Sequence, residues 1–437
     1  MDNEQTKTDD ILKILRLFQD PEVDRLKLNY EFVNATKFPF SFANMLAYKP
    51  EKSDPEDMIR LLEETEKFVQ EQDIDGVLLK FDIEALILSA VFSKYPKKNI
   101  KIPSFESIFL SHHKYYGRLK ERNPIKFGYI DIFEDDYKDK ILPFPFFLKP
   151  IDLNVSLHQY IIKNEEDFEN VLKILRKELP EMDKYSRFCY ERYLDFTKYP
   201  LAAKYIVLLE EIVDDGYQIN WEGFADDDGN IFTYCWTDEV LADKNKVIFS
   251  DFIMPSGFNE DLLEKAEKVC CDYLRDINFR NGFANIELWV RKNNNIQIIE
   301  VNPRCAYPYY HQYLLSFGTN LYDSVIQLSL GIIPDQKSIP SKSNFKRFST
   351  TTVISTKMNG KLSEIVNYPV LGELMKKNND YIFYIMLSDP NFIIENNIQN
   401  AGRVIMRIFY GKESYEEIIK ESLSLKKALL LKDDYFL

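Results

Sequence analysis

The sequence contains few of the residues that bind transition metals or form disulfides. It has 437 residues but only five cysteines and four histidines. The cysteines are odd in number and form no C-x-x-C pair, which argues against a disulfide framework or a zinc site and fits a reducing compartment. Because two of the histidines, His112 and His113, are adjacent, a histidine-ligated metal is not expected either.

The sequence also lacks a net positive charge, long apolar runs and an export signal. Its formal net charge is −14, whereas binding to nucleic-acid phosphates requires a basic surface. The apolar run at residues 85–92 is far shorter than a membrane span. Residues 1–18 are acidic and contain no secretory hydrophobic region. These features predict a cytoplasmic protein without a nucleic-acid or membrane partner.

The first part of the chain alternates helical and strand patterns. A hydrophobic content of 45% in a chain of this length predicts several packed domains. Asp54 and Pro55 are typical of a helix start, and a short buried strand and a helix over 83–95 follow. This rhythm predicts a small parallel-sheet α/β domain.

The rest of the chain is rich in strands up to about residue 330. Residues 331–344 contain two prolines and many polar residues, and we interpret them as a linker. A compact C-terminal domain follows, and its last helix starts at a capping box formed by Ser414 and Glu417. The apolar face of that helix packs either internally or across a homodimer.

A hairpin is predicted shortly before the linker. Two apolar runs, at residues 282–290 and 296–302, are separated by a short segment that is rich in asparagine. Asparagine tolerates the positive φ that tight hairpin turns demand. A turn centred on Asn293 and Asn294 fixes the register of the two strands.

The predicted register places two carboxylates directly opposite each other. Glu287 pairs with Glu300 and Asn285 with Asn302, and all four side chains share one face. Opposed carboxylates destabilise a bare hairpin, and a divalent cation between them removes the repulsion. Because Glu287, Glu300 and Asn302 offer only oxygen ligands, they favour Mg²⁺ or Mn²⁺. The alternative is that both glutamates are solvated on an exposed face.

Arg304 and the tyrosine-rich segment after it extend this candidate site. Arg304 can hold a phosphoryl group in its planar fork. Cys305 and His311 are interpreted as packed residues, and the tyrosines between them either line a substrate pocket or pack. Residues 226–250 form either a cover over the site or a surface hairpin.

The stretches NIELWV and IIEVNPR resemble the metal-binding signature of the ATP-grasp superfamily, in which a glutamate is followed by Glu-x-Asn-x-Arg. The resemblance implies an α/β chain with the ATP-grasp fold. It implies a preceding small parallel-sheet domain at 1–110, an ATP-grasp domain of two subdomains at 111–332, and a C-terminal α+β domain at 333–437.

Two lysines resemble the family's nucleotide-phosphate residues. Lys149, in FPFFLKP, matches the lysine strand, and Lys114 matches the first nucleotide lysine, although a solvated helix lysine is the alternative interpretation. The family places a glycine-rich loop after the lysine strand, but residues 149–162 contain no glycine. Asn154 and Ser156 can supply polar contacts to ATP there, but close backbone approach is harder without glycine.

Residues 205–223 resemble the family's hinge, which lies near 210–216. The resemblance places Glu210 or Glu211 at the adenine, Gly216 in the turn and Gln218 at the ribose. Many members have an acidic residue at the last position, so Gln218 is a departure that can still bind hydroxyls.

The resemblance implies an ATP-dependent carboxylate–amine ligase that uses Mg²⁺ or Mn²⁺ and forms an amide through an acyl phosphate. Arg304 is then the catalytic residue for phosphoryl transfer. The layout looks most like the L-amino acid ligases, so amino acids are the expected substrates. No base for the amine is identified. The alternatives are a regulatory nucleotide-binding protein without efficient ligase activity and an enzyme of the carboxylase type.

Overall fold

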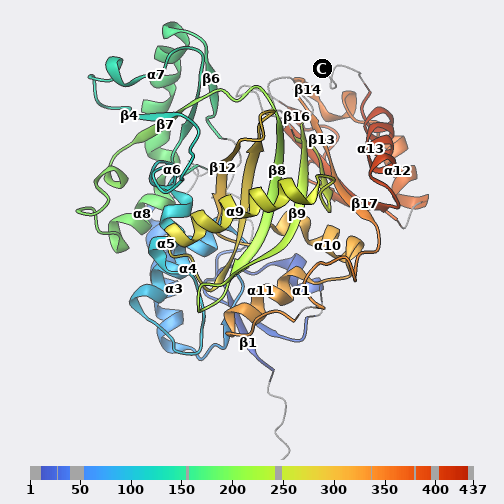
Figure 1. Cartoon of the computed structure of the whole chain (residues 1–437), viewed down its shortest axis with the longest axis horizontal. Helices are drawn as coiled ribbons and strands as arrows, with labels where there is room; N and C mark the ends of the chain where they lie inside the picture. Colours follow the sequence, from blue (N-terminus) through green and yellow to red (C-terminus); the bar gives the residue numbers. More distant parts are fainter. Residues whose placement is uncertain are drawn as a thin grey trace, which may run out of the picture.

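The N-terminal part of the chain forms a small parallel sheet flanked by helices (Figure 1). The computed structural model describes residues 11–26, 28–39, 54–153, 157–241, 249–335, 337–377, 380–394 and 403–431. The sheet has the order β2-β1-β3, formed by β1 (Lys13–Arg16), β2 (Glu31–Asn34) and β3 (Gly76–Val77). The nearby helices are α1 (Pro21–Arg25), α3 (Pro55–Glu71), α4 (Asp82–Lys94), α5 (Phe105–His112) and α6 (Lys114–Arg118). The predicted parallel sheet is confirmed, and Asp54 caps α3 as predicted.

A four-stranded antiparallel sheet follows, in the order β4-β7-β5-β6. Its strands are β4 (Phe127–Asp131), β5 (Phe146–Pro150), β6 (Tyr160–Ile162) and β7 (Ile206–Glu211). Between them lie η2 (Lys138–Lys140), α7 (Glu165–Met182), α8 (Lys184–Tyr193) and η3 (Pro200–Ala203). Phe146 and Leu148 pack in one core with the buried side chains of α7. Since side chains alternate along a strand, Lys149 points to the opposite face.

The largest sheet has eight strands in the order β12-β11-β8-β9-β10-β13-β17-β15. They are β8 (Tyr217–Ala225), β9 (Ile231–Leu241), β10 (Phe249–Met254), β11 (Gly282–Val290), β12 (Ile296–Asn302), β13 (Phe348–Thr356), β15 (Ile382–Ile385) and β17 (Arg403–Lys412). Because β13 pairs with β10, the sheet continues across the predicted boundary at residues 332–333. Helix α9 (Glu260–Asp276) crosses this sheet in Figure 1.

The remaining elements follow β12 in the chain or lie among the C-terminal strands. They are η4 (Tyr307–Tyr309), α10 (Tyr310–Ser316), α11 (Leu321–Ser329), β14 (Gly360–Lys361), η5 (Leu362–Glu364), α12 (Tyr368–Lys377), β16 (Ile393–Ile394) and α13 (Tyr415–Leu429). The described residues of the predicted linker form no helix or strand. Helix α13 begins at the predicted capping box of Ser414 and Glu417. Its apolar face packs internally, in one core with side chains of β13 and β17.

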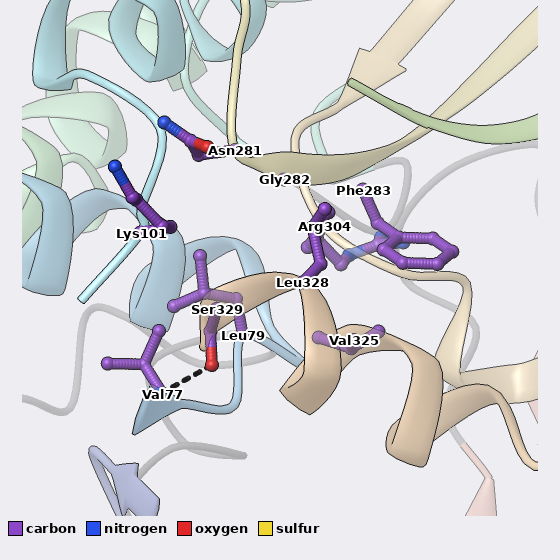
Figure 2. A pocket seen from close by; sticks show the side chains of 10 residues that line it. All are labelled: Val77, Leu79, Lys101, Asn281, Gly282, Phe283, Arg304, Val325, Leu328 and Ser329. Carbon is purple, nitrogen blue, oxygen red and sulfur yellow. Dashed lines mark hydrogen bonds between the residues drawn. The ribbon is translucent and has the colours of Figure 1, made fainter. Parts of the chain in front are cut away.

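The parallel sheet meets the large sheet at a seam beside α11. The Ser329 hydroxyl accepts a hydrogen bond from the Val77 backbone N–H at 2.9 Å. A small pocket lies at this seam, between β3, the start of β11 and α11 (Figure 2). It is lined by Val77, Leu79, Lys101, Asn281, Gly282, Phe283, Arg304, Val325, Leu328 and Ser329.

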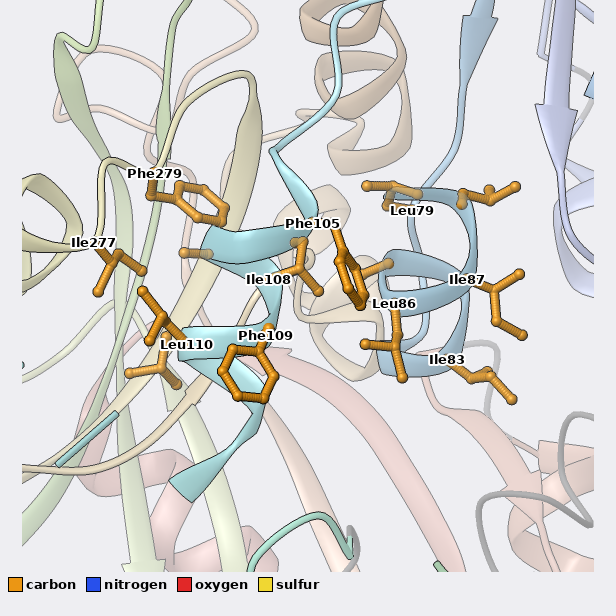
Figure 3. Close-up of a cluster of buried hydrophobic side chains, with 14 of the residues drawn as sticks. Leu79, Ile83, Leu86, Ile87, Phe105, Ile108, Phe109, Leu110, Ile277 and Phe279 are labelled. Atoms are coloured by element: carbon orange, nitrogen blue, oxygen red, sulfur yellow. The ribbon is translucent and has the colours of Figure 1, made fainter. Parts of the chain in front are cut away.

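The largest apolar core joins the N-terminal helices to the large sheet. Figure 3 shows Leu86 of α4 facing Phe105 and Ile108 of α5, with Ile277 and Phe279 beyond. The same core includes residues of α9 and the adjoining sheet face. It therefore holds α5, and α6 directly after it, beside β12. Within the described part of the chain, no helix has the length and apolar character needed to cross a membrane.

Candidate active site

The predicted hairpin forms and places the two glutamates opposite each other. In the pairing of β11 with β12, Glu287 lies opposite Glu300 and Asn285 lies opposite Asn302. The four side chains share one face of the large sheet because they occupy alternate positions. The predicted cross-strand pairs are therefore confirmed.

Beside the turn, the predicted register was wrong by one residue. Val290 lies opposite Ile296, and the turn contains Asn294 with a φ of 60°. Ile299 has no partner on β11, so a β-bulge there absorbs the difference before Glu300. The predicted register at the glutamates is correct because the bulge compensates for the error at the turn.

The glutamates belong to a polar patch on this face of the sheet, which we call the site face. It is formed by Gln218, Asn220 and Glu222 of β8, Glu239 of β9, Asn285 and Glu287 of β11, and Glu300 and Asn302 of β12. The intervening residues, such as Ile219 and Ile286, pack in the core with α9 on the other face. Burying the apolar face against α9 thus fixes the polar residues on the site face.

The two opposed glutamates differ in their electrostatic environment. Burial opposes ionisation of Glu300, but the positive charges of Lys114 and Lys149 outweigh it and lower its pKa. The Glu300 carboxylate lies 3.0 Å from Lys114 Nζ. Burial, with the negative charges of Glu239 and Glu300, raises the pKa of Glu287 well above its ordinary value. A divalent cation between the two glutamates would favour the ionised form of both.

The donor chemistry of this pair fits a hard divalent cation. Glu287, Glu300 and Asn302 present carboxylate and carboxamide oxygens, which Mg²⁺ and Mn²⁺ prefer. No cluster of three or more Asp, Glu, His or Cys side chains suited to a metal occurs among the described residues. The predicted set contains two carboxylates only, so water and phosphate oxygens would complete the coordination, as is usual for Mg²⁺.

Both predicted lysines lie next to β12 and are buried. Lys149 Nζ is 2.8 Å from Glu210 and donates to the carbonyl of Ile299 at 3.5 Å. Lys114, besides its contact with Glu300, donates to the carbonyl of Leu153 at 2.9 Å. Lys114 is only 8% exposed to solvent, so the interpretation of it as a solvated helix lysine is wrong.

The structure separates the two candidate hinge glutamates. Glu210 is buried between Arg118, at 2.6 Å, and Lys149. Burial opposes its ionisation, but these two cations prevail and lower the pKa of Glu210 to about 2. The Glu211 side chain is partly exposed and pairs with Arg291 at 3.3 Å. Glu210, not Glu211, therefore lies beside Lys149.

Gly216, predicted in the hinge turn, and Gln218, predicted at the ribose, both have close neighbours on β11. Gly216 has a φ of +86°, and a Cβ there would lie 2.1 Å from the carbonyl of Val290. The Gln218 side chain donates to Glu287 at 3.3 Å. Ser156, together with Asn154, lies outside the described residues, so its predicted role stays a prediction.

Arg304 is held at the end of β12 by a residue of the N-terminal domain. Its Nε and Nη2 atoms lie 3.2 Å from carboxylate oxygens of Asp82, at the first position of α4. Its guanidinium also lies over the Tyr307 ring, 5.8 Å from the centroid. Burial raises the pKa of Cys305, which supports its interpretation as a packed residue. His311 contacts the rings of Tyr384 and Phe409.

Sequence reasoning missed several residues of the site. Arg118 follows Lys114 by four positions on the same helix face, which was the only local signal for it. Asp82, Glu222 and Glu239 reach the site through contacts between distant segments. Residues 231–241, which were considered as part of a cover, instead form β9 inside the large sheet.

Comparison with known proteins agrees with this geometry. Residues 142–307 match the ATP-grasp domain family. The chain carries an ATP-grasp domain. The matched residues include Lys149, the hinge, the paired glutamates and Arg304, whereas Lys114 precedes them. No match was found among curated protein sequences.

Solved structures share the fold over nearly the whole chain. An L-amino acid ligase from Bacillus licheniformis superposes with a TM-score of 0.71 at 16% identity, covering 98% of this chain and 100% of that one. An N5-carboxyaminoimidazole synthetase from Staphylococcus aureus complexed with ADP gives a TM-score of 0.61 at 12% identity, covering 95% and 96%. A biotin carboxylase from Campylobacter jejuni gives 0.53 at 14% identity, covering 85% and 78%. The predicted ATP-grasp fold is therefore confirmed.

The pocket in Figure 2 is separate from the paired glutamates of the ATP-grasp domain. Arg304 is the only candidate site residue in its lining, which otherwise comes largely from the N-terminal sheet, β11 and α11. Gly282 and Phe283 mark the start of β11, whereas Glu287 lies further along the strand. The pocket therefore lies between β3 and α11, next to Arg304, and not at the paired glutamates.

Proposed function

We propose that this ATP-grasp chain is an ATP-dependent carboxylate–amine ligase. The observation that carries the proposal is the convergence of Glu287, Glu300, Lys114 and Lys149 on one edge of the sheet. Two buried lysines suit the phosphates of ATP, and opposed carboxylates suit the divalent cation that accompanies them. Glu287, Glu300 and Asn302 would hold Mg²⁺ or Mn²⁺, which when bound neutralises phosphate charge.

The chemistry follows from the need to activate a carboxylate. Its oxygen attacks the γ-phosphorus of ATP, and the bond between the γ-phosphorus and the bridging oxygen breaks to release ADP. An amine then attacks the acyl phosphate carbon, and phosphate leaves. Lys149 and Lys114 neutralise the phosphates, while Arg304, oriented by Asp82, stabilises the transferring phosphoryl group.

We propose amino acids as the substrates. The fold likeness to an L-amino acid ligase covers both chains almost completely, including the N-terminal and C-terminal parts that flank the ATP-grasp domain. A site lined by carboxylates and arginine suits molecules that carry both an amine and a carboxylate. The glycine-free segment after Lys149 favours the alternative of a nucleotide-binding protein with little turnover.

A phosphate-release assay tests the proposal. The protein is incubated with ATP, Mg²⁺ and pools of amino acids, and Glu300→Ala is compared with the unchanged chain. We expect amino-acid-dependent phosphate release that falls about 100- to 1,000-fold in the variant, because one charge-stabilising group of the site is lost. ATP binding without turnover under every pool would contradict the ligase and support the regulatory alternative.

A further inference from the structure

Glu239 occupies an unusual position on the site face. It lies on β9 opposite Gln218 of β8, and only 5% of its surface is exposed to solvent. One carboxylate oxygen accepts hydrogen bonds from Asn220 at 3.0 Å and from the Tyr309 hydroxyl at 3.2 Å. The other oxygen, Oε2, is enclosed and has no hydrogen-bond partner among the residues that the structure describes.

An enclosed carboxylate oxygen without a donor is costly, so such atoms are uncommon unless a ligand satisfies them. The neighbouring Glu222 shows the contrast. Both of its oxygens accept from the backbone N–H of Ala306, at 2.8 and 3.1 Å, and Asn285 donates as well, at 3.0 Å. Glu222 therefore holds the turn that follows Arg304, whereas Glu239 retains an unused acceptor.

The surroundings of Glu239 connect it to the reacting groups. Tyr309, which donates to it, lies in η4, five positions after Arg304. Gln218, directly opposite on β8, donates to Glu287. The titratable groups close to Glu239 include Glu287, Glu300 and Tyr309. Burial, assisted by the negative charge of Glu300, raises the pKa of Glu239 to about 7.

Resting on the ligase function proposed above, we propose that Glu239 is the residue that binds the attacking amine and takes its proton. The ammonium group of the amino acid donates an N–H to Oε2 of Glu239 and gives that proton to the carboxylate, and the lone pair that this frees attacks the acyl phosphate carbon. The new C–N bond forms, the bond from that carbon to the phosphate oxygen breaks, and phosphate leaves with the electron pair. The second proton that the nitrogen loses after the attack leaves with the phosphate.

The test separates acyl phosphate formation from amine attack. With ATP, Mg²⁺ and a pool of the protein amino acids, hydroxylamine traps the acyl phosphate as a hydroxamate, and it needs no base because it is uncharged at neutral pH. Amide formation from the same pool is measured in parallel by mass spectrometry. We expect Glu239→Gln to lower the ratio of amide to hydroxamate at least ~100-fold, as for loss of a general base.

Two further variants control for structural effects. Glu239→Asp keeps a carboxylate and is expected to restore part of the ratio. Asp238→Asn alters the next residue, which faces the other side of the sheet and accepts from Gly257 and Tyr415. We expect Asp238→Asn to leave the ratio unchanged.

The outcomes distinguish the inference from the function on which it rests. Hydroxamate formation with a selective loss of amide in Glu239→Gln supports the assignment. Amide formation at the original ratio, or a parallel loss of both products in a folded variant, overturns it. If the unchanged chain forms no hydroxamate with any pool, the ligase function itself is wrong.

Discussion

At the scale of single residues, neighbouring cations decide which buried carboxylates of the candidate site favour the charged form. Glu210 and Glu300 lie against cations, which lower their pKa despite burial. Glu222 and Glu239 have hydrogen-bond donors but no adjacent lysine, and burial raises their pKa to about 8 and about 7. The same side chain thus serves as a permanent anion in one position and as a titrating group in another.

The pKa of Glu222 gives a prediction for stability. Burial raises it from 4.5 to about 8, so folding favours the protonated form. The contribution to stability is fully present below about pH 4.5 and is lost as the pH rises towards 8, with a slope of at most about 1.4 kcal/mol per pH unit. Glu222→Gln removes this dependence. When unfolding free energies are measured with urea from pH 5 to 8, the protein with Glu222 should lose stability relative to Glu222→Gln as the pH rises. The same pH dependence in both proteins would contradict the prediction.

At the scale of elements, a β-bulge in the β11–β12 hairpin keeps Glu287 and Glu300 opposite each other. The turn shifts the register by one residue, and the bulge at Ile299 restores it before Glu300. Without the bulge, the Glu300 side chain would no longer lie opposite Glu287. The carbonyl of Ile299 is also bound by Arg118, at 2.7 Å, and approached by Lys149. The bulge is therefore held by two buried cations, Arg118 and Lys149.

The hinge turn between β7 and β8 gives a second prediction. Gly216→Ala places a Cβ 2.1 Å from a backbone carbonyl at a positive φ, so the hinge must shift. We expect a loss of about 1–3 kcal/mol in unfolding free energy and weaker ATP binding.

Gly229→Ala is the matched control for Gly216→Ala. Gly229 also has a positive φ, of +84°, but the nearest atom to an added Cβ is in the Arg280 side chain at 3.3 Å. Urea unfolding and calorimetric ATP titration should therefore show a smaller loss of stability and unchanged ATP affinity. Equal effects of the two substitutions would show that steric contact at the hinge is unimportant.

At the scale of the whole molecule, Arg118 joins the two sheets of the ATP-grasp domain. It binds Glu210 of β7 at 2.6 Å and the β12 carbonyls of Ile298 and Ile299 at 2.9 and 2.7 Å. It also pairs with the buried Glu121. One buried guanidinium thus fixes β7, which is bound to Lys149 through Glu210, and β12 relative to each other.

Removing Arg118 should destabilise the molecule strongly. Arg118→Met leaves Glu121 without its buried cation and leaves Glu210 with Lys149 alone, and we expect the unfolding free energy measured with urea to fall by about 3–5 kcal/mol. Arg122→Met is the control, because Arg122 pairs with Asp272 and Asp276 on the surface, where solvent screens the interaction. Similar unfolding midpoints for the two variants would contradict the assignment.

Sequence patterns predicted the elements whose signals are local. The Asp54 cap, the Ser414 capping box and the opposed glutamates of the hairpin each depend on a few neighbouring residues. The family signature added Lys149, Lys114 and the hinge. The bulge at Ile299 was not predicted, because nothing in the alternation of IQIIEVN marks an extra residue.

The sequence by itself determined which groups are available for chemistry: two glutamates, an asparagine and an arginine at the end of a hairpin, with lysines on earlier segments. Only the tertiary structure decided which of them meet. Asp82 reaches Arg304, Arg118 reaches Glu210, and Tyr309 reaches Glu239 across separations of 222, 92 and 70 residues. Such contacts depend on the packing of whole sheets and helices, because burial and charge at each atom are set by segments that local patterns do not connect.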